Sequence, residues 1–116
     1  MPTDLYNAIV PSGSSNGRQK KISGTTSGAA DTLHTTGAGI DEIYVYAINT
    51  SGADVYLTIV LGGTTSPDDE VTDLINSKAG YQLIIPGVRL NGTVAIKAFA
   101  ASADVINCLT IVNKLS

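Results

Sequence analysis

Apolar and polar residues alternate along the second half of this chain, and that alternation restricts its fold more than any other feature. Between residues 42 and 49, Ile43, Val45 and Ala47 fall on one face of an extended strand. The next such segment, 54–61, repeats the pattern with Val55, Leu57, Ile59 and Leu61. A period of two residues is typical of a β-strand with one buried face.

The composition agrees with this pattern. Val, Ile and Thr together make 34 of the 116 residues, whereas aromatic residues make only 5%. β-Branched side chains have few rotamers and pack well on a pleated sheet. A chain of this length can bury one core. We therefore expect a single all-β domain with an aliphatic core.

Turn residues separate the expected strands. Further strands are predicted at 19–23, 31–35, 71–75, 81–85, 93–100 and 104–113, and 71–75 also suits one helical turn. Residues 50–53 and 101–103 and the pair Asn91-Gly92 have the composition of hairpin turns, and Pro86-Gly87 is expected to end a strand. Short strands at this spacing predict an antiparallel β-sandwich, similar to a jelly roll.

The N-terminal third differs from the rest. Gly, Ser and Thr fill 16 of the 29 positions from 11 to 39, so this stretch has little apolar surface to bury. We divide the chain into an arm with the first short strands, 1–39, and a sandwich domain, 40–116. An apolar group in the arm would gain by docking on a surface: Leu5, Tyr6, Ile9 and Val10. Simple disorder of the terminus is the alternative.

Several strands are apolar on both faces, although a two-sheet sandwich buries only one face of each sheet. Tyr44, Tyr46 and Ile48 lie opposite the buried face of the 42–49 strand, and Tyr56 does so in the next strand. Large exposed apolar patches mark interaction sites, and Tyr is enriched in them. We predict that these four residues form a self-association interface. The alternative is that the arm or the 62–80 loop covers them.

Charge and chemistry exclude several classes of protein. The net charge is −3, which does not suit nucleic-acid binding. No stretch approaches 18 apolar residues, and the N-terminus lacks the basic region of a secretory signal, so we expect no membrane partner. With one Cys (Cys108), one His (His34) and no paired acid and base, we expect no enzymatic activity, metal site or cofactor. The acidic segment 68–73 is read as a solvated loop, with Ca²⁺ binding as its alternative.

Basic residues concentrate in one place. Arg18, Lys20 and Lys21 are three of the seven Lys and Arg residues. On an acidic chain, this asymmetry predicts a contact with an acidic protein surface, and a solvated turn is the alternative. We assign these three residues to the docking arm, together with the apolar residues of its N-terminal part.

Several runs of the chain resemble small β-sandwich virion proteins of tailed bacteriophages. The resemblance covers roughly residues 40–114 and rests on IYVYA at 43–47, LGGT at 61–64, IIPGVRLNG at 84–92, VAIKAFA at 94–100 and LTIVNK at 109–114. It implies a head decoration, or cement, protein on the capsid surface, assembled in the host cytoplasm. The implied partners are further copies of the chain, as a trimer, and the major capsid protein.

Two other functions remain open at this point. One is another virion component, such as a head–tail connector, a tail part or a fibre-associated module. The other is a carbohydrate-binding sandwich for host attachment, which would need an exposed aromatic platform with polar neighbours. The absence of Trp does not favour the latter.

Overall fold

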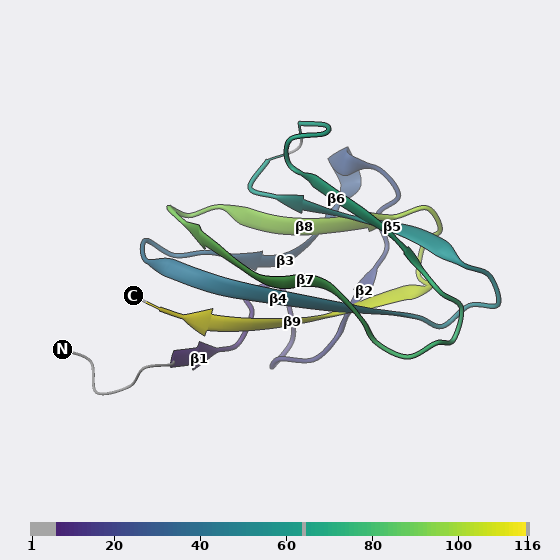
Figure 1. Cartoon of the computed structure of the whole chain (residues 1–116), viewed down its shortest axis with the longest axis horizontal. Coiled ribbons are helices and arrows are strands. Elements are labelled where there is room, and N and C mark those ends of the chain that lie inside the picture. The colour runs from purple at the N-terminus through teal and green to yellow at the C-terminus, as the bar shows by residue number, and fades with distance from the viewer. Residues whose placement is uncertain (1–6, 64, 116) are drawn as a thin grey trace.

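The computed structural model describes residues 7–63 and 65–115. Within them, nine β-strands form two antiparallel sheets that pack face to face, and one short 3-10 helix, η1 (Ser27–Ala29), precedes the third strand (Figure 1). The expected all-β sandwich is confirmed.

The first sheet contains five strands: β1 (Asn7–Ile9), β2 (Lys20–Ile22), β4 (Ile40–Asn49), β7 (Gln82–Asn91) and β9 (Ile106–Lys114). Its order is β1–β9–β4–β7, and β2 also pairs with β9. β1 pairs with the C-terminal end of β9 and β2 with its N-terminal end, so the two short strands share one edge of the sheet (Figure 1).

The second sheet contains four strands: β3 (Asp31–Thr35), β5 (Val55–Leu61), β6 (Glu70–Ile75) and β8 (Ala95–Ala100). Its order is β3–β8–β5–β6. The segment 71–75, for which the sequence also allowed a helical turn, is therefore a strand.

The strand pairs are nested. β5 pairs with β6, β4 with β7, β3 with β8 and β2 with β9. This pattern is that of one long hairpin rolled up so that its successive pairs alternate between two sheets. Eight antiparallel strands connected in this way form a jelly roll, so the structure also fixes the strand order that the sequence left open.

Three turns that we expected to close hairpins instead carry the chain from one sheet to the other. Residues 50–53 lie between β4 and β5, the turn that begins after Asn91 at Gly92 connects β7 to β8, and residues 101–103 lie between β8 and β9. Gly92 has the left-handed backbone that its sequence predicts (φ 80°), but the second left-handed residue is Thr93 (φ 58°) and not Asn91, which ends β7. Among consecutive strands of the described chain, β5 and β6 alone pair with each other.

The expected strand end at Pro86-Gly87 is wrong, because β7 continues to Asn91. β7 lies at an edge of the first sheet, where a proline without an N–H group is tolerated. The pairing of β4 with β7 shifts register beside Tyr44. Gly87 has φ of 107°, and a Cβ there would lie 3.1 Å from the Tyr44 ring, so both the backbone and the close approach favour glycine.

The boundary that we expected at residue 40 does not separate an arm from the sandwich. β2 and β3 are integral strands, because they pair with β9 and β8. Even the described part of the N-terminal arm lies on its own domain, since β1 pairs with β9 and the Gly13 N–H donates to the Leu33 carbonyl (3.2 Å). The jelly roll therefore begins at Lys20, and the segment from residue 7 covers its edge.

The core lies between the two sheets and is almost entirely aliphatic. Its fully buried members include Ile22 from β2, Ile43 and Val45 from β4, and Leu57 and Ile59 from β5. These are the inward positions of the period-two pattern. Burying this apolar surface is the main stabilising contribution to the fold.

Candidate functional site

The face of the first sheet that points away from the core carries a group of apolar side chains, which we call the outer face. Its members come from three adjacent strands and from the residue before β7: Tyr44, Tyr46, Ile48, Tyr81, Leu83, Leu109 and Ile111. Tyr81, Leu83 and Ile111 are 50%, 47% and 42% exposed. In a sandwich that acts alone, only the inner face of each sheet meets the core, so an outer face is expected to be polar. An apolar outer face is instead typical of an interaction site.

The strand register brings these side chains together. Tyr46 lies opposite Leu109 of β9 on one side and opposite Leu83 of β7 on the other. Its ring also packs edge-on against the Tyr81 ring, with centroids 6.4 Å apart and an interplanar angle of 77°. Tyr44 lies opposite Ile111. The outer face is therefore a continuous apolar surface across the middle of the sheet.

The predicted interface of four residues is not one surface. Tyr44, Tyr46 and Ile48 share the outer face as expected, but Tyr56 belongs to β5 in the second sheet. It points away from the core and is 58% exposed, on the opposite side of the sandwich. Tyr56 is therefore removed from this surface, because the chain crosses between the sheets at residues 50–53.

A polar group closes one end of the outer face. Glu42 accepts hydrogen bonds from the Tyr44 hydroxyl (3.2 Å) and the Asn113 amide (3.3 Å), and it pairs with Arg89 (3.3 Å). The hydrogen bond from Asn113 is the main reason why the pKa of Glu42 lies below its ordinary value. The hydrogen bond to Glu42 raises the pKa of Tyr44. Tyr44 is thus held at a fixed position beside charged groups.

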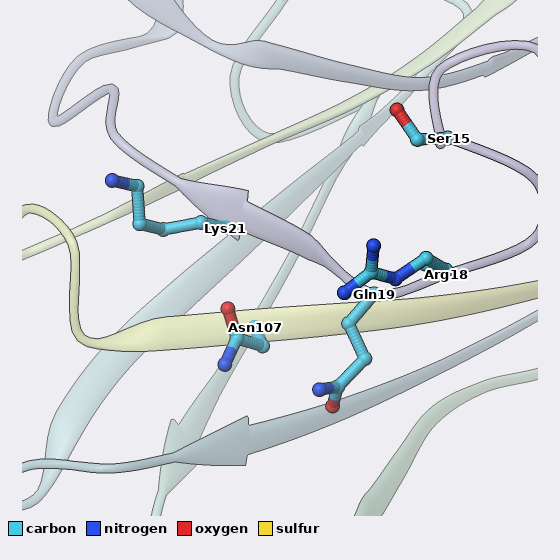
Figure 2. A pocket seen from close by; sticks show the side chains of 5 residues that line it. All are labelled: Ser15, Arg18, Gln19, Lys21 and Asn107. Carbon is cyan, nitrogen blue, oxygen red and sulfur yellow. The ribbon is translucent and has the colours of Figure 1, made fainter.

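An open hollow of about 390 Å³ lies beside the other end of the outer face (Figure 2). It is lined by Ser15, Arg18, Gln19, Lys21 and Asn107, which come from the segment leading into β2, from β2 itself and from β9. All five side chains carry hydrogen-bond donors, and two of them are cations.

The hollow is joined to the outer face by a hydrogen bond. The Tyr81 hydroxyl donates to Gln19 Oε1 (2.5 Å), and Tyr81 is the ring that packs on Tyr46. Lys21 pairs with Asp104 at 3.7 Å, with both side chains more than half exposed. Arg18 makes no ion pair within the described part of the chain. An apolar centre with a polar rim is the usual arrangement of a protein interface.

The other residues assigned to the docking arm are dispersed. Leu5 and Tyr6 lie outside the described residues. Ile9 is the last residue of β1 and is 36% exposed, and Val10 follows it at 59%. Lys20 belongs to β2 but does not line the hollow, because its backbone register places it on the face opposite to that of Lys21.

A buried polar network, which the sequence reading missed, fastens the N-terminal segment to the sandwich. His34 and Asp41 are 3% and 1% exposed, and their side chains are joined at 2.9 Å. The Ser12 backbone N–H donates to His34 Nδ1 (3.1 Å), so the ring proton lies on Nε2 and is donated to Asp41. Lys114 approaches the second oxygen of Asp41 at 3.5 Å.

Ser12, His34 and Asp41 are the residue types of a hydrolytic triad, but their arrangement differs from one. His34 Nδ1 accepts the Ser12 backbone N–H and lies 3.3 Å from the Ser12 hydroxyl, while Nε2 bonds to Asp41. In a hydrolytic triad the ring is the other way round, with Nε2 facing the serine and Nδ1 bonded to the carboxylate. The Ser12 hydroxyl itself accepts the Thr35 N–H at 2.8 Å. The network therefore holds the 11–14 turn against β3. Its signal in the sequence was Asp41, a charged residue at an inward position of the alternation that continues through Ile43 and Val45.

The remaining candidate positions are Cys108 and the acidic segment 68–73. Cys108 is buried, and this burial raises the pKa of its thiol to about 12. In the acidic segment, Asp69 accepts the Thr65 N–H (3.0 Å) and orders its own turn. Within residues 7–63 and 65–115, no three His, Cys, Asp or Glu side chains are placed to hold a metal ion.

The fold and surface define a jelly-roll protein with an apolar outer face on one sheet and a cationic hollow beside it. No family model, curated protein or solved structure matches the chain. None of the helices in the described part of the chain is long and apolar enough to cross a membrane.

Proposed function

We propose that this chain is a structural protein of a bacteriophage particle, a decoration or cement protein that attaches to the capsid surface and stabilises it. The observation that carries the proposal is the apolar outer face of the first sheet. Tyr81, Leu83 and Ile111 are each at least two-fifths exposed, although side chains of this size are usually buried or paired with a partner.

The architecture supports the same function. Jelly rolls are common among viral capsid proteins, although they also occur in lectins and enzymes. The resemblance of residues 40–114 to virion proteins of tailed phages favours the capsid over those other uses. The trimer and the major capsid protein are the partners that this resemblance implies.

Two surfaces make different contacts in this proposal. The outer face, with Tyr46 at its centre, packs against another copy of the chain. The N-terminal segment, with Ile9 and Val10 exposed beyond the edge of β9, contacts the capsid. Several weak contacts suffice in such an assembly, because each contact raises the effective concentration for the next.

Binding to empty heads tests the proposal. Purified chain is mixed with phage heads assembled without it, and co-sedimentation and the temperature at which the heads break open are measured. We expect saturable binding and a higher opening temperature, and a chain carrying Tyr44→Ala and Tyr46→Ala should bind less. A chain that is monomeric at every concentration and does not bind heads would overturn the proposal.

One observation favours a second candidate, carbohydrate binding for host attachment. The exposed Tyr81 ring lies beside Tyr46 and is bonded to the Gln19 amide, which gives an aromatic surface with a polar neighbour. Against it, the two rings are nearly perpendicular and do not form a flat platform. A glycan array separates the candidates, because binding to a defined glycan that Tyr81→Ala abolishes would favour attachment to the host.

A further inference from the structure

The cationic hollow is an unassigned anion site. Arg18 and Lys21 supply positive charge, and Ser15, Gln19 and Asn107 supply neutral donors. Figure 2 shows these five side chains around the hollow on β2, β9 and the segment between residues 15 and 19. Cations combined with amide and hydroxyl donors are suited to an oxyanion such as a carboxylate.

The hydrogen bonds of the hollow leave donors available. Gln19 accepts the Tyr81 hydroxyl through Oε1, so its amide nitrogen is left to donate. Lys21 is partly compensated by Asp104 at 3.7 Å. Arg18 is exposed and makes no ion pair with any described residue. Arg18 is therefore the strongest uncompensated charge at this site.

The same chain carries an exposed carboxylate that could bind to the hollow of another copy. The loop between β5 and β6 contains Asp68, which is exposed, and Asp69, whose carboxylate accepts the Thr65 N–H within the loop. Asp68 makes no hydrogen bond or ion pair with any other part of the chain that the structure describes. Its carboxylate is thus available to a partner.

The hollow and this loop lie at opposite corners of the sandwich. The hollow adjoins β2 at one edge of the first sheet, whereas the loop adjoins β6 at the far edge of the second sheet, an edge that lies next to β7. They also lie at opposite ends of the strands. The loop begins at Leu61, which lies opposite Ile96 at the start of β8. Lys21 of the hollow lies opposite Asn107 at the start of β9, and the chain reaches β9 only after it has run the length of β8.

We infer that the hollow binds the Asp68 carboxylate of a second copy of this chain. Complementary charges at opposite corners cannot meet within one molecule, but they can meet head to tail between copies. A head-to-tail contact closes into a ring when its rotation allows, and a cyclic trimer is built from such contacts. The inference rests on the proposed function in one respect, because it specifies the self-association that a decoration protein needs.

A charge swap tests this contact. Arg18→Asp alone and Asp68→Arg alone should each weaken association at least about tenfold, because each places like charges together. The double variant Arg18→Asp with Asp68→Arg should recover most of the lost affinity, because the pair is restored with its signs exchanged. The association is measured by sedimentation equilibrium of the full chain at low and high salt, and the native affinity should fall as salt rises.

The matched control is Lys78→Asp, which changes the net charge by the same amount as Arg18→Asp at another exposed position. It should associate like the native chain. The inference is overturned if the double variant stays dissociated, or if Arg18→Asp weakens association while Asp68→Arg does not, which would mean that Arg18 contacts a group of the second copy other than Asp68. These results differ from a failure of the proposed function, which would appear as loss of head binding by the native chain.

Discussion

Replacing Tyr46 by Ala should separate assembly from folding. Tyr46 lies at the centre of the outer face and is only partly buried, so the folded chain loses little when its ring is removed. The structure gives it one aromatic partner, Tyr81, and such pairs contribute about 0.5–1.5 kcal/mol. We therefore expect the free energy of unfolding of the monomer to fall by about 1 kcal/mol.

The effect on assembly should be larger. A tyrosine at the centre of an interface costs about 2 kcal/mol or more when truncated, which corresponds to about a thirtyfold rise in the dissociation constant. Sedimentation equilibrium measures this constant, and guanidinium unfolding of the dilute chain measures the stability. The prediction is a loss of association that clearly exceeds the loss of fold stability.

Tyr56→Ala is the matched control, because it removes the same side chain from an exposed position on the other sheet. It should leave the dissociation constant within about twofold of the native value. If Tyr56→Ala weakens assembly and Tyr46→Ala does not, the interface lies on the second sheet and the reasoning from the outer face is refuted.

Three further predictions concern stability. Asp41→Ala should lower the free energy of unfolding by about 3 kcal/mol in guanidinium titrations, because it leaves the buried His34 N–H without an acceptor; a loss below about 1 kcal/mol would contradict the network. Burial raises the pKa of Cys108 from 9.0 to about 12, so the folded chain keeps a proton that the unfolded chain loses, and stability should fall by up to about 1.4 kcal/mol per pH unit as pH rises from 9 to 12. Cys108→Ala should lose stability less steeply over that range, and parallel curves would disprove the assignment. Deleting residues 1–17 should destabilise the domain in thermal unfolding, whereas deleting residues 1–9 should have a smaller effect, because only the longer deletion removes the N–H that Ser12 donates to His34; equal effects would count against this.

The sequence predicted where strands lie better than how they pair. The segments around Ile43 and Ile59 were identified because a half-buried strand must alternate. Asn91-Gly92 predicted a chain reversal correctly, but the φ values that these residues favour are local. Whether the next strand joins the same sheet depends on contacts far along the chain, so three expected hairpins became crossings between sheets.

In the candidate site, too, features within one strand were predicted and contacts between strands were not. Tyr44 and Tyr46 were placed on one face correctly, because both belong to one strand and alternation alone puts them there. Tyr56 was grouped with them wrongly, because its face depends on which sheet β5 joins. The hollow forms because the fold brings Arg18 close to Asn107. These two residues are far apart in the sequence, so no local pattern predicts that they meet.

Hydroxyl-radical footprinting of the native chain across a range of concentrations tests the central claim most directly, because it reports the exposure of each tyrosine separately. Tyr81 and Tyr56 are 50% and 58% exposed in one molecule, so they should be labelled at similar rates in dilute solution. As the concentration rises, we predict that Tyr81 becomes protected while Tyr56 does not. Labelling of Tyr81 that stays constant through assembly, or protection of Tyr56 alone, would contradict the account.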